Sequence, residues 1–278
     1  MTGALGREFI FSDRQFKRLR AFVAEHTGIA LSEAKKDMVY GRLSKRIRSH
    51  FAGNFQAFCD AIEQGDAQEQ DFLINAITTN LTAFFREAHH FDYLRQRLIP
   101  ELLRRNAHSR KIRIWSAGCS TGEEPYSIAM SLAGDNQLAG WDIKILATDL
   151  DANVLKHAEA GIYSEERISK LAEQQRQYFQ RGRGSNSGLV RLKPEIRERV
   201  SFKRLNLLHD WPMRGPFDLI FCRNVVIYFD KPTQTKLFDR FADLLVADGH
   251  LFIGHSESLY KVTERFTSLG NTIYRRLS

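Results

Sequence analysis

The chain has 278 residues, of which 43% are hydrophobic and 27% charged, and its formal net charge is +8 at pH 7. This length allows one large or two modest domains with a buried core. No apolar run approaches the roughly 20 residues of a membrane span and the N-terminus lacks a signal-peptide pattern, so we expect a cytoplasmic protein. Three widely spaced cysteines form neither a disulfide framework nor a metal-binding pair. The positive charge is typical of a basic enzyme, or of a protein with acidic partners such as nucleic acid.

Residues 1–85 are predicted to be helical throughout. Ser12 and Gln15 form a capping box in front of a run with helical apolar spacing, and Gly28 ends this first helix. The following helices are predicted from Ser32 to about Ser49 and then at about 54–64 and 68–79.

The second of these helices is strongly basic. Lys35, Arg42 and Arg46 fall within roughly 40° of one another at 3.6 residues per turn. Within the segment only Glu33 and Asp37 offset six cations. A solvated helix face is the ordinary interpretation of such a run, and a docking surface for an acidic helix is the competing one.

Residues 80–92, NLTAFFREAHHFD, join the helical region to the rest of the chain. Asn80, Thr82 and Arg86 are polar positions among apolar ones. An arginine between aromatic pairs at such a junction buries its stem while its guanidinium seeks an anion, although a plain surface cation remains an alternative. The adjacent His89 and His90 are expected to point apart on a helix, so no metal site is predicted.

Residues 111–125, KIRIWSAGCSTGEEP, are the centre of the predicted second half of the chain. Lys111–Trp115 is predicted as a strand, 118–122 as a glycine-bounded loop, and Glu123 as the start of a helix that Thr121 would cap. A strand, a glycine-rich turn and a helix form the first unit of a doubly wound sheet, in which ligands bind at the carboxyl ends of the strands.

The loop in this stretch does not match the dinucleotide fingerprint G-x-G-x-x-G. Glu123 and Glu124 follow where a pyrophosphate would lie, so they favour a cationic ligand instead. S-adenosylmethionine carries a sulfonium and an amino group and lacks phosphate, and it therefore fits better than NAD. A tight turn without any ligand remains open on this evidence alone.

The second predicted strand, 142–149, ends in an acid, Asp149. A carboxylate at this position accepts hydrogen bonds from both hydroxyls of a ribose. Alternatively it caps the helix that follows, although Asp151 is also placed to be that cap.

The strand–helix alternation is interrupted at 161–200 and then resumes. Tyr163–Phe179 is predicted to be helical, and it is followed by a Gly/Arg turn and a short strand at Leu189–Lys193, which together indicate a small inserted subdomain with β character. Further strands are predicted at 200–206, 216–223 and 250–254, with a helix at 232–246 and a final hairpin within 266–276. Residues expected at or just beyond the strand ends are Asn206, Leu207, Arg223, Asn224 and Tyr228.

Several long motifs, in the same order, closely resemble the CheR-type chemotaxis receptor methyltransferases: TNLTAFFREAHHF, AGCSTGEEPYSIA, ATDLD, GLVR and FDLIFCRNVVIYFDK. The resemblance covers nearly the whole chain. It implies a Rossmann-like class I methyltransferase domain of α/β class with a mainly parallel sheet, at 86–278. A small all-α domain at 1–85 would precede it, and the insert at about 161–200 would be a small β-subdomain.

The resemblance also implies an activity and a site. The family transfers a methyl group from S-adenosylmethionine to glutamate side chains of membrane chemoreceptors, giving a methyl ester and S-adenosylhomocysteine. Cofactor contacts are implied at Asn80, Thr82, Arg86, Glu124, Asp149, Asn206, Leu207, Arg223 and Asn224. Arg86 and Tyr228 are the candidate catalytic residues.

The implied partners are the cytoplasmic domains of chemoreceptors. Lys35, Arg42 and Arg46 are the candidates for steering acidic receptor helices, and the turn Gly182-Arg183-Gly184 resembles the version of the insert that docks a receptor's C-terminal tethering peptide. We expect a cytoplasmic monomer that is recruited to receptor arrays without inserting into the membrane.

Two rival functions use the same cofactor pocket. A nucleic-acid methyltransferase acting on base amines usually carries an N/D-P-P-Y/F tetrapeptide after the fourth strand, where this chain has RNVVIYF. A non-catalytic sensor of S-adenosylmethionine is the second rival, and the full set of polar strand-end residues argues against it.

Overall fold

The computed structural model describes residues 7–277. The chain folds into two compact units. The first comprises the residues up to Thr79 and also Tyr228–Asp230, and the second comprises Asn80–Ile227 and the residues from Lys231 onward. None of the helices within the described residues combines the length and the apolar composition that a membrane crossing requires.

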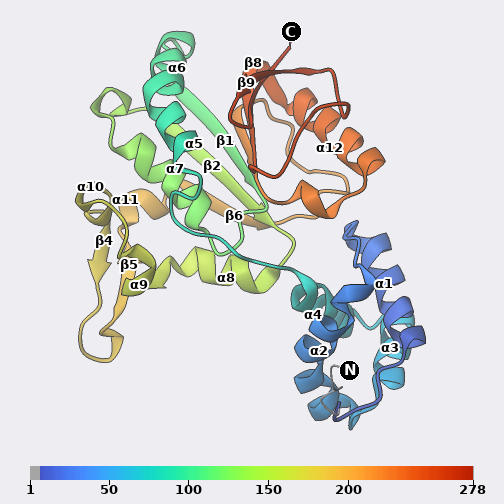
Figure 1. Ribbon diagram of the computed structural model, residues 1–278. Coiled ribbons are helices and arrows are strands. Elements are labelled where there is room, and N and C mark those ends of the chain that lie inside the picture. The colour runs from blue at the N-terminus through green and yellow to red at the C-terminus, as the bar shows by residue number, and fades with distance from the viewer. Residues whose placement is uncertain (1–6, 278) are drawn as a thin grey trace. The chain divides into compact units, whose positions relative to one another are not determined.

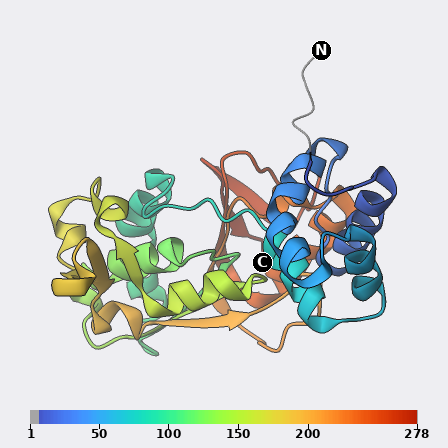
Figure 2. The same cartoon turned by 90° about the horizontal axis from the view of Figure 1, so that it is seen from below.

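The first unit is helical, and its helices pack side by side (blue in Figure 2). Ser12 and Gln15 form the predicted capping box and Gly28 takes the left-handed conformation at the end of the first helix. Interior faces carry fully buried apolar side chains such as Phe16, Leu43 and Phe58. The elements are α1 (Asp13–Thr27), η1 (Glu33–Lys35), α2 (Lys36–Phe51), α3 (Phe55–Glu63) and α4 (Ala67–Ile77).

The cations of α2 have more acidic partners than the local sequence indicates. Arg46 forms a two-pronged ion pair with Glu69 of α4, and both side chains are largely buried. Arg48 pairs with Glu8, and Lys36 pairs with Asp13 at 2.5 Å. Acids from distant parts of the chain therefore offset cations that the count within the segment left unbalanced. Arg42 donates to the carbonyls at the end of α4, those of Ala76 and Thr78.

The second unit is built on a seven-stranded sheet within the described residues, in the order β6-β2-β1-β7-β8-β10-β9 (Figure 1). The pairs β6–β2, β2–β1, β1–β7 and β7–β8 are parallel, and β10 is antiparallel to both of its neighbours. This confirms the predicted Rossmann-like, mainly parallel sheet. The strands are β1 (Lys111–Ala117), β2 (Asp142–Asp149), β6 (Val200–Arg204), β7 (Phe217–Cys222), β8 (Leu245–Ile253), β9 (Phe266–Gly270) and β10 (Ile273–Arg276).

Helices between the strands cover the sheet, as right-handed crossovers require. The strand β7 is buried at every position, which is expected of a central parallel strand covered on both faces. The main helical elements are α5 (Ala88–Tyr93), the π-helix η2 (Leu94–Leu98), α6 (Ile99–Arg105), α7 (Glu123–Ala133), α8 (Ala152–Ala160) and α12 (Lys231–Leu244), with short turns η3 (Asn136–Leu138) and η5 (Val226–Tyr228).

The insert forms a separate three-stranded sheet in the order β3-β5-β4, as the predicted β character requires. Its strands are β3 (Ile162–Ser164), β4 (Phe179–Arg181) and β5 (Leu189–Leu192), and its helical turns are α9 (Glu165–Ile168), α10 (Glu173–Arg176), η4 (Gly184–Asn186) and α11 (Pro194–Arg197).

Two local predictions were wrong. The stretch 163–179 is not one helix, since it begins and ends in strands and holds only the two four-residue helices α9 and α10. Thr121 does not cap α7, because Gly122 occupies the cap position with φ +96° and makes no side-chain cap. The hydroxyl of Thr121 donates instead to Oε2 of Glu123, at 2.6 Å.

Candidate active site

Four neighbouring parallel strands bring most of the predicted polar residues to one edge of the sheet. Thr148 of β2 lies in register with Ala117 of β1, and Asp149 lies in register with Arg204 of β6. Ser116 lies in register with Phe221 of β7, one residue before the end of that strand. The loops that follow these strands therefore start at the same edge, which is the ligand-binding edge of a doubly wound sheet.

The glycine loop after β1 is held close to its surroundings. The amides of Gly118 and Cys119 both donate to the carbonyl of Thr148, at 2.8 and 2.9 Å. Gly118 has φ +82°, and a Cβ there would lie 2.3 Å from Val225. Only glycine combines this backbone conformation with so close an approach.

Asp149 organises this loop from the end of β2. Its Oδ2 accepts the amide of Ser120 at 2.8 Å, and its Oδ1 accepts the amide of Asp151 at 3.0 Å. Burial raises the pKa of the Asp149 carboxyl, and the backbone hydrogen bonds oppose that rise. Asp151, the alternative considered from the sequence, is the cap of α8, because its Oδ1 accepts the amides of Asn153 and Val154.

Glu124 and Arg223 form a buried ion pair at the start of α7. Nη1 of Arg223 donates to Oε2 of Glu124 at 3.0 Å, and Oγ of Ser116 donates to Oε1 at 2.7 Å. Arg223 also lies 3.2 Å from Glu87. Burial raises the pKa of the Glu124 carboxyl, and the charge of Arg223 counteracts it. Two residues that the resemblance implied as separate cofactor contacts thus also stabilise one another.

The segment 80–86, called the crossing segment below, runs across the same edge of the sheet. The side-chain amide of Asn80 donates to Oδ2 of Asp151 at 2.9 Å, and the Asn80 carbonyl accepts from Oγ of Ser120 at 3.2 Å. Nη1 of Arg86 donates to the carbonyl of Leu81 at 2.8 Å. Phe85 has φ +52°, a strained value of the kind that concentrates at functional sites.

Sequence reasoning missed Glu257, which holds the loop after β7. Its buried carboxylate accepts four backbone amides: those of Gly254, Asn224, Val226 and Ile227, at 2.5 to 3.3 Å. Burial raises its pKa, and these four hydrogen bonds oppose the rise. The only signal was an acidic residue just after a strand, in the run His255-Ser256-Glu257, and it gave no hint of the distant partners.

The remaining predicted residues lie on the loops that follow β6 and β7. The carboxamide oxygen of Asn206 accepts the amide of Leu208 at 2.9 Å, and Leu207 is buried. Asn224 has φ +60°, and its side chain lies over Gly254, where a Cβ would come within 2.3 Å of it. Tyr228 ends η5, and its carbonyl accepts the amide of Ala30 at 3.1 Å.

Glu87, His89 and His90 lie closer together than expected. Their potential ligand atoms are all within 4.8 Å of one another, so the argument that the two histidines point apart was wrong. A cation is already present, because Arg223 lies 3.2 Å from Oε2 of Glu87. Burial alone would raise the pKa of Glu87, but the hydrogen bond from His255 and the charge of Arg223 lower it to about 2.

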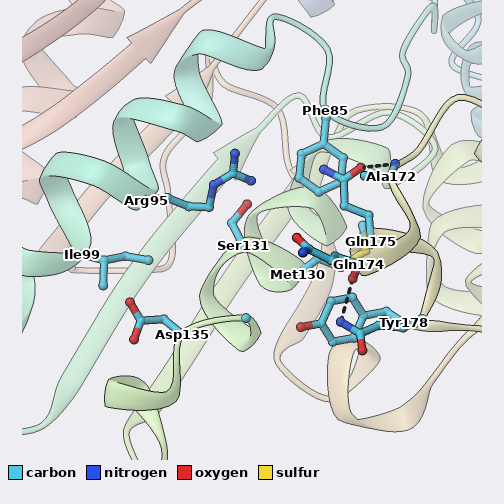
Figure 3. Close-up of a pocket in the computed structure, with 12 residues that line it drawn as sticks. Phe85, Arg95, Ile99, Met130, Ser131, Asp135, Ala172, Gln174, Gln175 and Tyr178 are labelled. Atoms are coloured by element: carbon cyan, nitrogen blue, oxygen red, sulfur yellow. Dashed lines mark hydrogen bonds between the residues drawn. The ribbon is translucent and has the colours of Figure 1, made fainter.

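A cavity of about 590 Å³ lies at the other end of α7 from Glu124 (Figure 3). Apolar side chains of Phe85, Ile99 and Met130 line it together with polar ones of α10 and its surroundings. Figure 3 shows the side-chain oxygen of Gln175 accepting the backbone amide of Ala172, a hydrogen bond that closes the first turn of α10 beside the cavity. This cavity is distinct from the edge of the sheet to which the predicted cofactor residues belong.

The residues at the sheet edge fit a cationic nucleoside. Buried carboxylates, Glu123 and Glu124, occupy the start of α7, where a phosphate would otherwise bind. Asp149 ends the second strand of the sheet, which is the position of a ribose acceptor in such folds. Oε1 of Glu123 is buried without a hydrogen-bond partner among the described residues. An acidic site of this kind suits S-adenosylmethionine and disfavours a dinucleotide.

Comparison with known proteins agrees with this geometry. The model of the SAM-binding domain of CheR methyltransferase matches residues 80–275, and that of the CheR methyltransferase all-alpha domain matches 14–78. The chain belongs to the CheR methyltransferase family. This confirms the family resemblance, the S-adenosylmethionine-dependent methyltransferase activity and the cofactor.

Curated relatives in the same family are similar over nearly their whole length. The chemotaxis protein methyltransferase of Escherichia coli (strain K12) is 46% identical over 95% of this chain and 91% of its own. Chemotaxis protein methyltransferase 2 of Pseudomonas aeruginosa is 44% identical over 96% of this chain and 95% of its own. A solved S-adenosylmethionine dependent methyltransferase from Mesorhizobium loti is 17% identical over 51% of this chain and 45% of that one. Its TM-score of 0.32 is too low to support an argument.

Proposed function

We propose that this CheR family member methylates glutamate side chains of membrane chemoreceptors during chemotaxis adaptation. The observation that carries the proposal is the acidic, phosphate-excluding start of α7 beside the glycine loop, in a chain whose relatives are named chemotaxis protein methyltransferases. The products are a glutamate methyl ester and S-adenosylhomocysteine.

The cofactor would be held at the sheet edge by this chain's polar residues. Asp149 takes the ribose hydroxyls, and Glu124 faces the cationic portion of the ligand, while the charge of Arg223 favours the ionised form of Glu124. Asn80, Thr82, Arg86, Asn206, Leu207 and Asn224 complete the implied set. When bound, S-adenosylmethionine supplies an electrophilic methyl group on a sulfonium.

The reaction needs no general base, because a glutamate carboxylate is already ionised at pH 7. The enzyme's task is to hold the carboxylate in line and to exclude water from two opposite charges that disappear as the reaction proceeds. Arg86 orients the cofactor and steers the glutamate by an oblique contact, since a full ion pair to the attacking oxygen would reduce its nucleophilicity. Tyr228 donates a hydrogen bond to the substrate carboxylate.

Two surfaces would bring the receptor in. Lys35, Arg42 and Arg46 steer acidic receptor helices by charge, and of these Arg46 contributes least because Glu69 already neutralises it. Among the described residues β4 is an edge strand that pairs only with β5, so its outer edge is where an extended peptide would add as a further strand, and the turn that follows it carries Arg183 at its exposed tip.

In that turn a Cβ on Gly182 would lie 2.1 Å from the carbonyl of Asn186, so the glycine is needed for the turn itself. Gly184 has φ +59° and begins η4. We place the enzyme in the cytoplasm as a monomer that a receptor's C-terminal peptide recruits to receptor arrays.

The test is methyl transfer itself. The full chain is incubated with S-adenosylmethionine labelled in its methyl group and with a receptor cytoplasmic domain. We expect label on the receptor that is released by mild base, as a glutamate methyl ester is. A matched receptor domain whose methylation-helix glutamates are replaced by alanine should take up none. Label on RNA in place of the receptor would support the nucleic-acid rival, and cofactor binding without any transfer would support the sensor.

A further inference from the structure

The insert at 161–200 contacts two segments at the candidate cofactor site. Nη1 of Arg167, on α9, donates to the carbonyl of Thr82 at 2.9 Å. The hydroxyl of Tyr163, on β3, donates to the carbonyl of Thr121 at 2.7 Å. Because Thr82 lies in the crossing segment and Thr121 lies in the glycine loop, the insert holds two parts of the site that are distant in sequence.

Aromatic packing supports the same contact. The ring of Phe84 meets Tyr163 edge to face at 4.9 Å and Phe179 of β4 at 5.4 Å, measured between ring centroids. Phe84 and Tyr163 are both buried. The crossing segment is therefore seated on the insert by its side chains as well as by the hydrogen bond to its backbone.

Arg167 also faces a buried acid, Glu123. The Glu123 side chain has no exposed surface, and its Oε1 has no hydrogen-bond partner among the described residues. Nη2 of Arg167 is the basic group near this oxygen, at 3.6 Å. Burying a carboxylate without a cation is costly, so Arg167 offsets a charge located at the first turn of α7.

We propose that Arg167 is a positioning residue of the cofactor site: one guanidinium holds the Thr82 carbonyl and Glu123, and so fixes the crossing segment against the start of α7. This deepens the proposed function and rests on it. Arg167 acts through Thr82 and Glu123 and not on the reacting atoms. Lysine is a poor substitute, because a single ammonium lacks the planar fork that reaches two acceptors.

The first test measures binding of S-adenosylhomocysteine to the full chain by titration calorimetry. Arg167→Ala should raise Kd about tenfold, as expected for losing a hydrogen bond from a charged donor, and Arg167→Lys should give an intermediate value. The kcat at saturating S-adenosylmethionine should change much less than its KM. The control is Arg176→Ala, an exposed arginine on α10 of the same insert, which should leave Kd unchanged.

A purely structural role for Arg167 would lower the melting temperature and leave Kd at the wild-type value, and that result would overturn the proposal. The second test needs no ligand. Hydrogen exchange at the amide of Phe85, which donates to Oγ of Ser127 at 2.9 Å, should accelerate in Arg167→Ala. If wild-type protein fails to bind S-adenosylhomocysteine, the proposed function fails, and the exchange experiment still decides the role of Arg167. Unchanged exchange would refute that role.

Discussion

Nη1 of Arg223 lies 3.0 Å from Oε2 of Glu124, and this buried ion pair joins the end of β7 to the start of α7. Arg223 directly follows β7, and Glu124 is the second residue of α7, the helix that follows the neighbouring strand β1. The pair therefore links the stability of the domain to the geometry of the cofactor site.

Removing one member of this pair should destabilise the protein strongly. Arg223→Met leaves Glu124 buried without its cation, and we expect the free energy of unfolding to fall by about 3–5 kcal/mol in urea denaturation. The double variant Glu124→Gln with Arg223→Met should recover part of that loss without recovering cofactor affinity. As a control, Arg95→Met breaks the exposed pair with Asp92 and should cost less than about 1 kcal/mol. Strictly additive losses in the double variant would contradict the pairing.

Glu257 should control the loop that carries Asn224. The substitution Glu257→Gln replaces one carboxylate oxygen by an NH₂ group, which cannot accept the two amides that this oxygen bound. We expect a loss of at least about 2 kcal/mol in unfolding free energy, weaker binding of S-adenosylhomocysteine and faster exchange of the Val226 amide. Glu264→Gln, at an exposed acid ten residues after Gly254, is the matched control. Wild-type affinity in Glu257→Gln would show that the loop keeps its position without the carboxylate.

The proposed roles of Arg86 and Tyr228 can be tested separately by the kcat of single variants. For Arg86→Ala we expect kcat for receptor methylation to fall on the order of a hundredfold, as when one electrostatic contact to a reacting group is removed. Near-normal turnover would refute its catalytic role. Tyr228→Phe removes only the hydroxyl, so an unchanged kcat would exclude that hydroxyl from the mechanism.

The strand ends could be predicted from the sequence because the parallel strands show alternating or continuous apolar residues and are followed by polar or small ones. The glycine loop, Asp149 and Arg223 follow from that pattern, and Ser12 and Gly28 follow from local capping chemistry. Such signals act within a few residues of one another, which is why they can be recognised in a single sequence.

What could not be predicted depends on residues far apart in the chain. Glu257 binds amides 30 to 33 residues away, and Arg46 pairs with Glu69 across 23 residues. The strands β3 and β4 of the insert have three residues each, too short for alternation to distinguish them from the helical turns between them. Periodicity therefore located the active-site edge but not the contacts that hold it.

Charge steering by Lys35 and by Arg42 of α2 predicts a specific response to salt. Raising ionic strength should slow receptor methylation more than it weakens cofactor binding, because the first depends on long-range attraction. Lys35→Ala should lower kcat/KM for the receptor at low salt without changing stability. Arg46→Ala should instead lower the unfolding free energy by about 3 kcal/mol, since it leaves Glu69 buried and unpaired. Equal salt responses of the two assays would count against steering.

Two buried histidines should make stability depend on pH between about 4 and 6.5. Burial, together with the charge of Arg223 near His90 and of Arg105 near His250, lowers the pKa of each from 6.5 to about 4. Glu87 and His89 also face His90, and Arg275 and Asp248 also act on His250. Between pH 6.5 and pH 4 these histidines are protonated in the unfolded chain but not in the folded chain. The free energy of unfolding is therefore highest above pH 6.5, as far as these two groups determine it, and falls as the pH is lowered towards 4.

The slope supplies the measurement. Together the two histidines should contribute a slope of about 2.3 kcal/mol per pH unit to the free energy of unfolding between pH 6 and pH 5, because each takes up slightly less than one proton on unfolding in this interval. His90→Gln keeps a donor for the carbonyl of Asn271, which His90 contacts through Nε2 at 2.9 Å, and should halve this slope. His108→Gln, at an exposed position, should leave it unchanged. A wild-type slope in His90→Gln would mean that His90 is protonated in the folded protein, paired with the Glu87 carboxylate 3.5 Å away.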